Sequence, residues 1–322
     1  MTWGAERPGA ARSPGPLPAV LDCSRDGISP LTSANRSSEA PETVDLHVHS
    51  TASDGNVTPE AVVRRAKAVG LRAIALTDHD TLGGIPEALA AGQRYAIRVV
   101  AGCEFSAAAP WGEMHVLGYF LPPASPQLEA FLERCRADRV RRAQAMVEQL
   151  QRLGLGVSFE SVLQESGGGA VGRPHVARAI VRQGGAIDLG DAFDRYLGRG
   201  RPAFVEKTLP VFRSVAELVH AAGGLVSVAH LKERGTRAFI ERLKTEGLDA
   251  VETRHPSHDP DLRARLTDIA LRLGLLRTGG SDWHGDPEPG VTHGTIGSQA
   301  VPLEWLEKLD DFRARSLSSA AS

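Results

Sequence analysis

Short apolar runs and amphipathic stretches alternate along residues 44–122 of the chain. The run at 73–76, Ala-Ile-Ala-Leu, has the length of a buried strand, whereas the stretch after Thr58 carries its apolar residues on one helical face. Thr58 suits an N-cap, Pro59 suits the first helical position, and Gly70 suits the end of that helix. This alternation predicts βα units around a parallel sheet.

The alternation breaks at residue 123 and resumes near residue 206. Residues 128–153 predict one long, arginine-rich helix, and shorter helical pieces follow it. After the break, Ser214 and Glu217 have the spacing of a capping box at a helix start. Further strands are predicted at 98–103, 114–119, 225–230, 250–253 and 275–278.

These patterns predict an α/β barrel in two parts, with an insertion and two ends that lack apolar periodicity. We expect a flexible leader at 1–42, a first barrel part at 43–122, a helical insertion over the active site at 123–205, a second barrel part at 206–315 and a tail at 316–322. The leader is rich in Pro, Gly, Ser and Ala, a composition that favours disorder.

Composition narrows the class of protein. The 322 residues are 42% hydrophobic and 24% charged with a net charge of -2, which is typical of a soluble globular protein and offers no overall field for polyanions. Three irregularly spaced cysteines argue against a disulfide framework. No run approaches the length of about 20 apolar residues that a membrane helix needs. We therefore expect a cytoplasmic protein.

Side chains that bind metals stand at the ends of the predicted strands. His47 and His49 are two residues apart and so share one face of a strand. His79, Glu104, His230 and Asp282 follow, or end, later strands. The carboxyl ends of barrel strands converge on one face, so these side chains should meet in space.

The complete set of candidate ligands is too large for one ion and predicts a cluster of two or three. Imidazole and carboxylate together suit borderline divalent metals. Paired metals can activate a water and stabilise both oxygens of a phosphoryl transfer. The candidates are His47, His49, Asp54, His79, Glu104, His115, His230, Asp282 and His284.

Six motifs, in order, resemble those of the PHP (polymerase and histidinol phosphatase) family. They are DLHVHSTASDG, LTDHDT, the glutamate of AGCEFS, the histidine of EMHVLGY, VAH and GGSDWHG. The resemblance implies a distorted (βα)7 TIM-like barrel of the PHP type with a trinuclear metal site. Manganese is the expected metal, with iron or zinc as alternatives.

The resemblance also implies how the ligands are shared. One ion would take His47, His49, Glu104 and Asp282, a second Glu104, His115 and His230, and a third Asp54, His79 and His284. In this scheme Asp54, His255 and Asp282 are the candidate catalytic residues. Asp80 is expected to support His79 from behind the ligands.

Asp54, the GRPH stretch at 172–175 and the insertion resemble the branch that hydrolyses nucleotide phosphates. That branch is known for 3′,5′-bisphosphonucleotide phosphatase and for 5′-to-3′ exoribonuclease activity on short RNA. This chain departs from it at Leu231, where the branch usually has proline, and in the unfamiliar stretch at 232–234. From the resemblance to this branch we expect a small nucleotide or short RNA as substrate. We expect no membrane association and no stable protein partner.

Two alternatives stay open. A phosphatase for a small metabolite such as histidinol phosphate is disfavoured because that branch usually has histidine where this chain has Asp54. A non-hydrolytic, metal-stabilised scaffold is disfavoured because such modules tend to lose ligands, and all nine are present here.

Four residues are candidates for binding the substrate phosphate. Arg173 and His175 open a predicted helix, where an arginine fork, an imidazole and a helix N-terminus suit an anion. Lys207 follows a possible strand at 202–205. His255 follows the sixth strand and could meet a phosphate or protonate a leaving group. Exposed side chains without a ligand are the simpler alternative for Arg173, His175 and Lys207.

Overall fold

The computed structural model describes residues 42–287 and 294–320, which belong to one compact unit. The leader expected at 1–42 lies outside the described residues, apart from Glu42. The strands form one sheet in the order β7-β6-β5-β4-β3-β2-β1-β8. They are β1 (Thr43–Val48), β2 (Ala73–Leu76), β3 (Arg98–Ala109), β4 (Gly112–Tyr119), β5 (Leu225–Val228), β6 (Ala250–Arg254), β7 (Leu276–Gly279) and β8 (Val301–Pro302).

The sheet curves into a nearly closed, distorted barrel. β1, β2 and β3 are parallel neighbours, as are β5, β6 and β7. β4 is antiparallel to both β3 and β5, and β8 is antiparallel to β1. A bridge between Val48 and Trp283 brings the chain after β7 back to β1. The predicted α/β barrel is therefore confirmed, with β4 and β8 interrupting the strict βα repeat.

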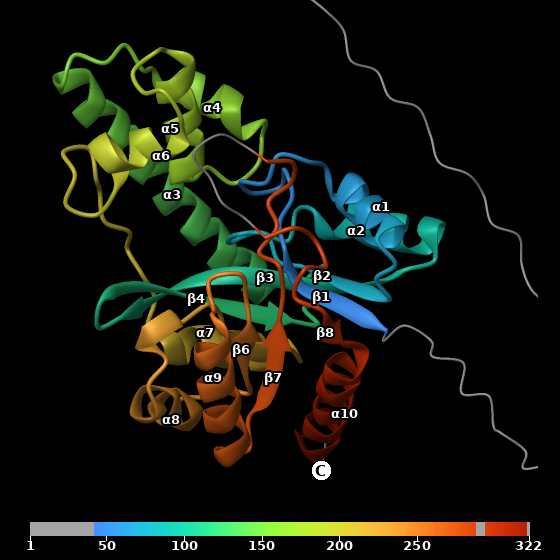
Figure 1. Cartoon of the computed structure of the whole chain (residues 1–322). Helices are drawn as coiled ribbons and strands as arrows, with labels where there is room; N and C mark the ends of the chain where they lie inside the picture. Colours follow the sequence, from blue (N-terminus) through green and yellow to red (C-terminus); the bar gives the residue numbers. More distant parts are fainter. Residues whose placement is uncertain (1–41, 288–293, 321–322) are drawn as a thin grey trace, which may run out of the picture. The chain divides into compact units, whose positions relative to one another are not determined.

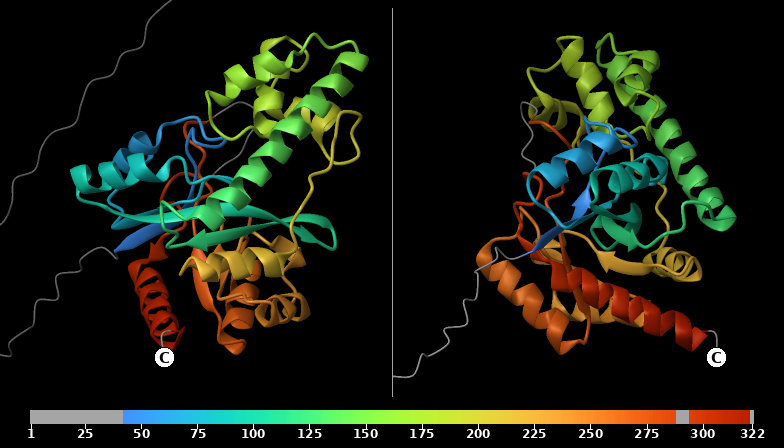
Figure 2. Two further views of the ribbon diagram at one scale, coloured as in Figure 1. Left: turned by 180° about the vertical axis from the view of Figure 1, so that it is seen from behind. Right: turned by 90° about the vertical axis from the view of Figure 1, so that its right-hand side faces the viewer.

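The helices cover both sides of the sheet. Figures 1 and 2 show α3–α6 on the same side as α1 and α2, with α7–α10 on the other side. The helices are α1 (Pro59–Ala68), α2 (Ile85–Tyr95), α3 (Pro126–Arg152), α4 (Phe159–Ser166), α5 (Arg173–Arg182), α6 (Leu189–Ala192), α7 (Phe212–Ala221), α8 (Arg237–Thr245), α9 (Pro260–Arg272) and α10 (Leu303–Ala320), with a π-helical turn η1 (Phe193–Leu197) and a 3-10 turn η2 (Lys232–Arg234).

The insertion has a hydrophobic core of its own. Met146 and Leu150 of α3 pack with Val176 and Ile180 of α5, and all four are buried. The helix starts are built locally: Ser125 accepts the Leu128 N–H at the start of α3, as Thr58 accepts the Ala61 N–H at the start of α1. The insertion is thus a small helical layer attached to the barrel through α3 and the chain that returns to α7.

Three local expectations are wrong. α7 begins at Phe212, so Ser214 lies within its first turn and cannot cap it. Residues 202–205 are a loop and not a strand, because Ala203 N–H donates to Tyr196 O and Arg142 Nε donates to Val205 O. Residues 316–320, expected as part of a tail, continue α10.

The strand at 98–103 is longer than expected. β3 runs on to Ala109 and pairs with all of β4 as a hairpin, which carries Glu104 inside a strand and not beyond its end.

Candidate metal centre

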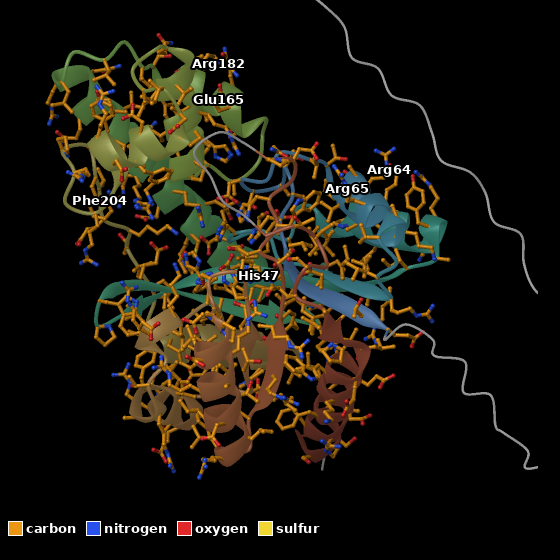
Figure 3. All side chains as sticks on the ribbon, viewed as in Figure 1. His47, Arg64, Arg65, Glu165, Arg182 and Phe204 are labelled. Carbon is orange, nitrogen blue, oxygen red and sulfur yellow. The ribbon has the colours of Figure 1, made fainter. Side chains whose placement is uncertain are left out.

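The candidate ligands converge at one end of the barrel, where the parallel strands β1, β2, β5, β6 and β7 have their carboxyl ends. His47, at the centre of the sheet in Figure 3, and His49 are completely buried, as is Glu104. His47 lies in β1, Glu104 in β3 and His115 in β4, whereas His49, His79, His230 and Asp282 lie in the turns just after β1, β2, β5 and β7. Asp54 and His284 approach from the loops that follow β1 and β7.

Glu104 lies at the middle of the cluster, and its two oxygens face different imidazoles. Oε2 lies 3.2 Å from His47 Nε2, 3.1 Å from His49 Nε2 and 3.3 Å from His79 Nδ1. Oε1 lies 2.7 Å from His115 Nδ1 and 3.0 Å from His230 Nε2. This arrangement suits a carboxylate that bridges two ions.

Asp282 and Asp54 complete the cluster on either side. Asp282 Oδ1 lies 3.3 Å from His47 Nε2 and 3.2 Å from His49 Nε2. Asp54 Oδ1 lies 3.4 Å from His284 Nε2, and Asp54 Oδ2 lies 3.8 Å from His79 Nε2.

Several of these ring nitrogens are buried but make no hydrogen bond. Both nitrogens of His49 and Nδ1 of His79 and His115 have no hydrogen-bond partner among the described residues, although carboxylate oxygens lie close by. Two ligands about 2.1 Å from one ion are separated by about 3.0 to 3.4 Å at the usual coordination angles. The donor atoms are therefore aimed at shared points and not at one another, as metal ligands are.

The ligand atoms fall into three groups, within each of which they lie within 4.8 Å of one another. One group is His47, His49, Glu104 and Asp282; the others are His79, Glu104 and His115, and His49, Asp54, His79 and His284. The first group is the set that the resemblance implies. The second group contains His79 in place of the expected His230, and the third contains His49 in addition to its expected members. His230 Nε2 lies 3.0 Å from Glu104 Oε1, and the His230 ring lies 5.1 Å from the ring of His115.

Burial and close charges shift the acidity of the cluster. Burial raises the pKa of Glu104, but His79 and His115 outweigh it and hold that pKa well below its usual range. Burial lowers the pKa of His79 to about 3. Burial also lowers the pKa of His115, but the Glu104 carboxylate outweighs it and brings the value to about 9. In the metal-free chain, protons on imidazoles such as His115 balance part of the negative charge, and a bound metal would displace them.

Glu252 of β6 supports the ligands from behind, and the sequence analysis missed it. Its Oε1 lies 2.9 Å from His47 Nδ1, the ring nitrogen that faces away from Glu104. Its Oε2 accepts the His230 backbone N–H at 2.7 Å. Such carboxylate–histidine pairs fix the orientation of metal ligands. The only sign of Glu252 in the sequence is that it is a lone carboxylate inside the predicted apolar strand at 250–253.

Two buried aspartates secure the loops that carry ligands. Asp45 Oδ1 accepts the Ser281 N–H at 2.9 Å, beside Asp282. Asp78 Oδ1 accepts the N–H of Ser50 at 2.8 Å and the hydroxyl of Ser53 at 2.7 Å, which fixes the loop that leads to Asp54.

Glycine is required where the chain after β7 passes β1. A Cβ on Gly280 would lie 2.4 Å from His47 Cβ, a separation that side chains do not tolerate. Asp282 follows with a φ of 51°, and His230 has a φ of 26°. Both ligands therefore adopt backbone conformations that non-glycine residues rarely occupy, as is common at functional sites.

The insertion contacts the loop that carries Asp54. Arg178 of α5 donates to the Asp54 backbone oxygen at 3.0 Å, and Ala170 N–H donates to Ala52 O at 2.9 Å. The helical layer thus lies against the metal cluster on the side of Asp54.

Three of the predicted site residues have partners within the fold. Asp80 does not hydrogen bond to His79; its carboxylate pairs with Arg139 of α3 at 2.6 Å. His175 is buried, and its Nδ1 accepts the Gly172 N–H at 2.9 Å as part of the α5 N-terminus. Lys207 Nζ donates to Ser106 Oγ at 2.6 Å and to Glu113 at 2.7 Å, so it is held in the wall of the site and is not exposed.

Arg173 lies at a pocket beside the candidate ligands, and His255 is buried next to Asp282. Arg173 lines a pocket that His115 and His230 also line. His255 Nε2 lies 3.3 Å from Asp282 Oδ2, and Ser257 Oγ lies 2.8 Å from its other ring nitrogen.

A barrel whose strand ends gather these imidazoles and carboxylates around Glu104 defines a metal-dependent hydrolase. The chain belongs to the PHP domain family, whose model matches residues 45–248. The expected family and enzyme class are confirmed: this is a metal-dependent phosphoesterase.

Curated relatives include nucleotide-processing enzymes. A 5′-3′ exoribonuclease of Haemophilus influenzae is 34% identical over 245 residues, which cover 74% of this chain and 89% of the relative. A 3′,5′-nucleoside bisphosphate phosphatase of Chromobacterium violaceum is 34% identical over 255 residues, which cover 77% and 89%. A phosphoribosyl 1,2-cyclic phosphate 1,2-diphosphodiesterase of Eggerthella lenta is 31% identical over 252 residues, which cover 75% and 94%.

Solved structures show the same fold. A protein of Bifidobacterium adolescentis, assigned as a metal-dependent phosphoesterase, is 30% identical with a TM-score of 0.77 and covers 84% of this chain and 96% of its own. A Chromobacterium violaceum protein assigned as an amidohydrolase, with bound sulfate, is 30% identical with a TM-score of 0.72 and the same coverage.

Within residues 42–287 and 294–320, none of the helices has both the length and the apolar character that crossing a membrane requires.

Proposed function

We propose that the chain hydrolyses phosphate esters of nucleotides, acting on 3′,5′-bisphosphonucleotides, on the 5′ ends of short RNA, or on both. The relatives from Haemophilus influenzae and Chromobacterium violaceum carry these activities in their names and match about three quarters of this chain.

One observation carries the proposal: a pocket of about 620 Å³ opens beside the metal ligands. His115 and His230 are among its lining residues. Its cationic lining residues are Arg173, Arg199, Lys232 and Arg234, and its aromatic ones are Trp111 and Phe204. Phosphates bind to arginine forks, and bases stack on aromatic rings and guanidinium groups. The lining therefore suits a molecule that has both.

Arg173 is the side chain best placed for a second phosphate. Its guanidinium is supported by the rings of Phe193 and Phe204, at 5.7 and 5.8 Å from their centroids, and makes no ion pair with any residue that the structure describes. In contrast, His175 and Lys207, the other proposed contacts, already have partners within the fold. The phosphate contact therefore rests mainly on Arg173.

The ligands that surround Glu104 would hold two or three divalent ions, and we propose manganese ahead of iron or zinc. Such ions activate water and neutralise charge that develops on a transferred phosphoryl group. The chain itself excludes bulk water from the buried histidines and orients His47 through Glu252. We assign to His255, whose Nε2 lies 3.3 Å from Asp282 Oδ2, the role of handing a proton to the departing oxygen.

Histidinol phosphate is a weaker candidate, because Asp54 lies among His49, His79 and His284 at the position where that branch usually has histidine. A scaffold without activity is also weaker, because eight of the nine expected ligands fall into the three groups and His230 Nε2 lies 3.0 Å from Glu104.

A substrate panel tests the proposal. Wild-type protein loaded with manganese, iron or zinc would be offered adenosine 3′,5′-bisphosphate, 5′-phosphorylated trinucleotide RNA, histidinol phosphate and phosphoribosyl 1,2-cyclic phosphate. We expect the first two to have kcat/KM at least about 10-fold above the others, and Arg173→Met to raise KM for the bisphosphate without loss of metal. Equal or greater kcat/KM for histidinol phosphate or the cyclic phosphate would overturn the nucleotide assignment.

A further inference from the structure

Trp111, at the tip of the β3–β4 hairpin, is held rigidly at the edge of the pocket beside the metal centre. Its indole N–H donates to the Glu113 backbone oxygen at 3.0 Å. The Phe239 ring of α8 packs on it with centroids 4.8 Å apart. The Arg234 guanidinium carbon lies 5.2 Å from the Trp111 ring centroid. A half-buried indole is thus fixed in one orientation with a guanidinium stacked on it.

Arg234 lies in the η2 turn, which follows the candidate ligand His230 closely in the chain. His230, a metal ligand, is followed by Leu231, which is buried in the barrel core, and then by the η2 turn that carries Arg234. Lys232 begins that turn with a φ of 54°, and its N–H donates to His258 Nε2 at 3.4 Å. Leu231 therefore anchors the turn and directs Arg234 towards Trp111, only four residues beyond a metal ligand.

The charges around this pair favour an anionic ligand. Arg234 is exposed and makes no ion pair with any residue in the described part of the chain. The two carboxylates that line the pocket are engaged elsewhere: Glu113 with Lys207 at 2.7 Å, and Glu233 with Arg265 at 2.8 Å. Of the lining cations, Arg199 pairs with Glu206 at 3.6 Å, whereas Arg173, Lys232 and Arg234 make no ion pair with any residue that the structure describes.

We propose that Trp111 and Arg234 form the platform on which the base of a bound nucleotide stacks, and that this platform makes the enzyme prefer nucleotides to phosphate esters that lack a base. The inference rests on the proposed function and adds to it the site of the base. Phe204, which lies where the insertion returns to the barrel (Figure 3), also lines this pocket, so the insertion and the barrel both contribute to it. Loss of one stacking contact with a base weakens binding by about 10- to 100-fold.

The test compares two substrates that differ only in the base. Adenosine 3′,5′-bisphosphate and 1,4-anhydroribitol 3,5-bisphosphate, which keeps the 2-hydroxyl and lacks only the base, would be offered to manganese-loaded wild type, Trp111→Ala and Arg234→Met. We expect kcat/KM for the nucleotide to fall about 10- to 100-fold in Trp111→Ala, and less in Arg234→Met, with a much smaller fall for the abasic substrate. Arg237→Met removes an exposed arginine of the neighbouring helix that does not line the pocket, and should behave as wild type.

An unchanged ratio of nucleotide to abasic kcat/KM in both variants would overturn the platform, as would a wild type that does not distinguish the two substrates. Because Arg234 is exposed, Arg234→Met keeps the test decisive if Trp111→Ala fails to fold.

A binding measurement separates this inference from the proposed function. Adenosine 5′-monophosphate should quench the tryptophan fluorescence of the wild type, and the quenching should largely disappear in Trp111→Phe, because Trp283 and Trp305, the other tryptophans among the described residues, do not line the pocket. Quenching that depends on Trp111 would support the platform even if neither nucleotide substrate is hydrolysed, in which case only the proposed function fails. Undiminished quenching in Trp111→Phe would overturn the platform.

Discussion

Glu252 Oε1 lies 2.9 Å from His47 Nδ1, and both side chains are completely buried. The same carboxylate accepts the His230 N–H through Oε2, so one side chain of β6 holds two ligands that come from β1 and the turn after β5. The pair keeps His47 Nε2 directed at Glu104.

Glu252→Gln should therefore weaken the metal site without removing a ligand. A glutamine has only one acceptor oxygen and cannot serve both His47 and the His230 N–H. Loss of such a supporting group typically costs about 10- to 100-fold in metal affinity or activity. Metal content after dialysis against a graded chelator measures the affinity. Glu307→Gln, on the exposed face of α10, is the matched control; the role of Glu252 is wrong if both variants retain metal as the wild type does.

Glu104 and Asp54 should differ in how many ions they hold. Asp54 belongs to one of the three ligand groups, whereas Glu104 belongs to the other two. We expect Asp54→Asn to lose one ion per chain and Glu104→Gln to lose more than one. In both variants kcat should fall by at least about 100-fold, because bound ions supply several kcal/mol of transition-state stabilisation. Elemental analysis counts the ions, and circular dichroism checks the fold. Equal metal loss would contradict the central place of Glu104.

The metal ligands could be predicted from the sequence because most of them stand at or next to the end of an apolar run. His47, His79 and Asp282 are identified in this way, and the structure brings them together. Their roles stay predictions until metal is measured. Glu252 could not be found in this way, because its importance depends on how β6 faces β1 across the barrel, and that pairing is not local.

Contacts between the helical insertion and the barrel also could not be predicted from the sequence. Asp80 follows His79 directly and was expected to support it, but its partner Arg139 is far along the chain in the insertion. Ser214 and Glu217 have capping-box spacing, yet Phe212 is buried in the core and starts α7 earlier. Local rules predicted the elements, and packing decided their ends and their partners.

The Asp80–Arg139 ion pair joins the insertion to the barrel. Arg139→Met tests how much this pair contributes to the free energy of unfolding. Both side chains are buried, with Arg139 Nη2 and Nε at 2.6 and 2.7 Å from Asp80 Oδ2. Removing the arginine leaves the buried carboxylate with the more distant Lys207 Nζ, 4.0 Å from Asp80 Oδ2, as its remaining cationic partner among the described residues. Breaking a buried pair costs about 3–5 kcal/mol, and we expect a loss towards the lower end of that range. Arg141→Met breaks an exposed pair with Asp138 on the same helix and should cost less than about 1 kcal/mol. Urea unfolding measures both. Similar losses in the two variants would show that the buried pair does not contribute as argued.

The His220–Asp249 pair should make stability depend on pH. The Asp249 carboxylate, 2.8 Å from His220 Nε2, raises the pKa of this histidine above its ordinary value of 6.5. A raised pKa in the folded state means that the stabilisation is fully present below pH 6.5 and is lost as pH rises through the folded value. The side chain is 39% exposed, so solvent screening limits the effect to less than about 1 kcal/mol. Urea unfolding of wild type and His220→Gln, with chelator present so that metal binding does not contribute, should show a difference in free energy that is larger at about pH 5 than at about pH 9. A difference that does not change with pH would mean that Asp249 does not raise the pKa of His220, whereas a difference that grows with pH would reverse the sign argued here.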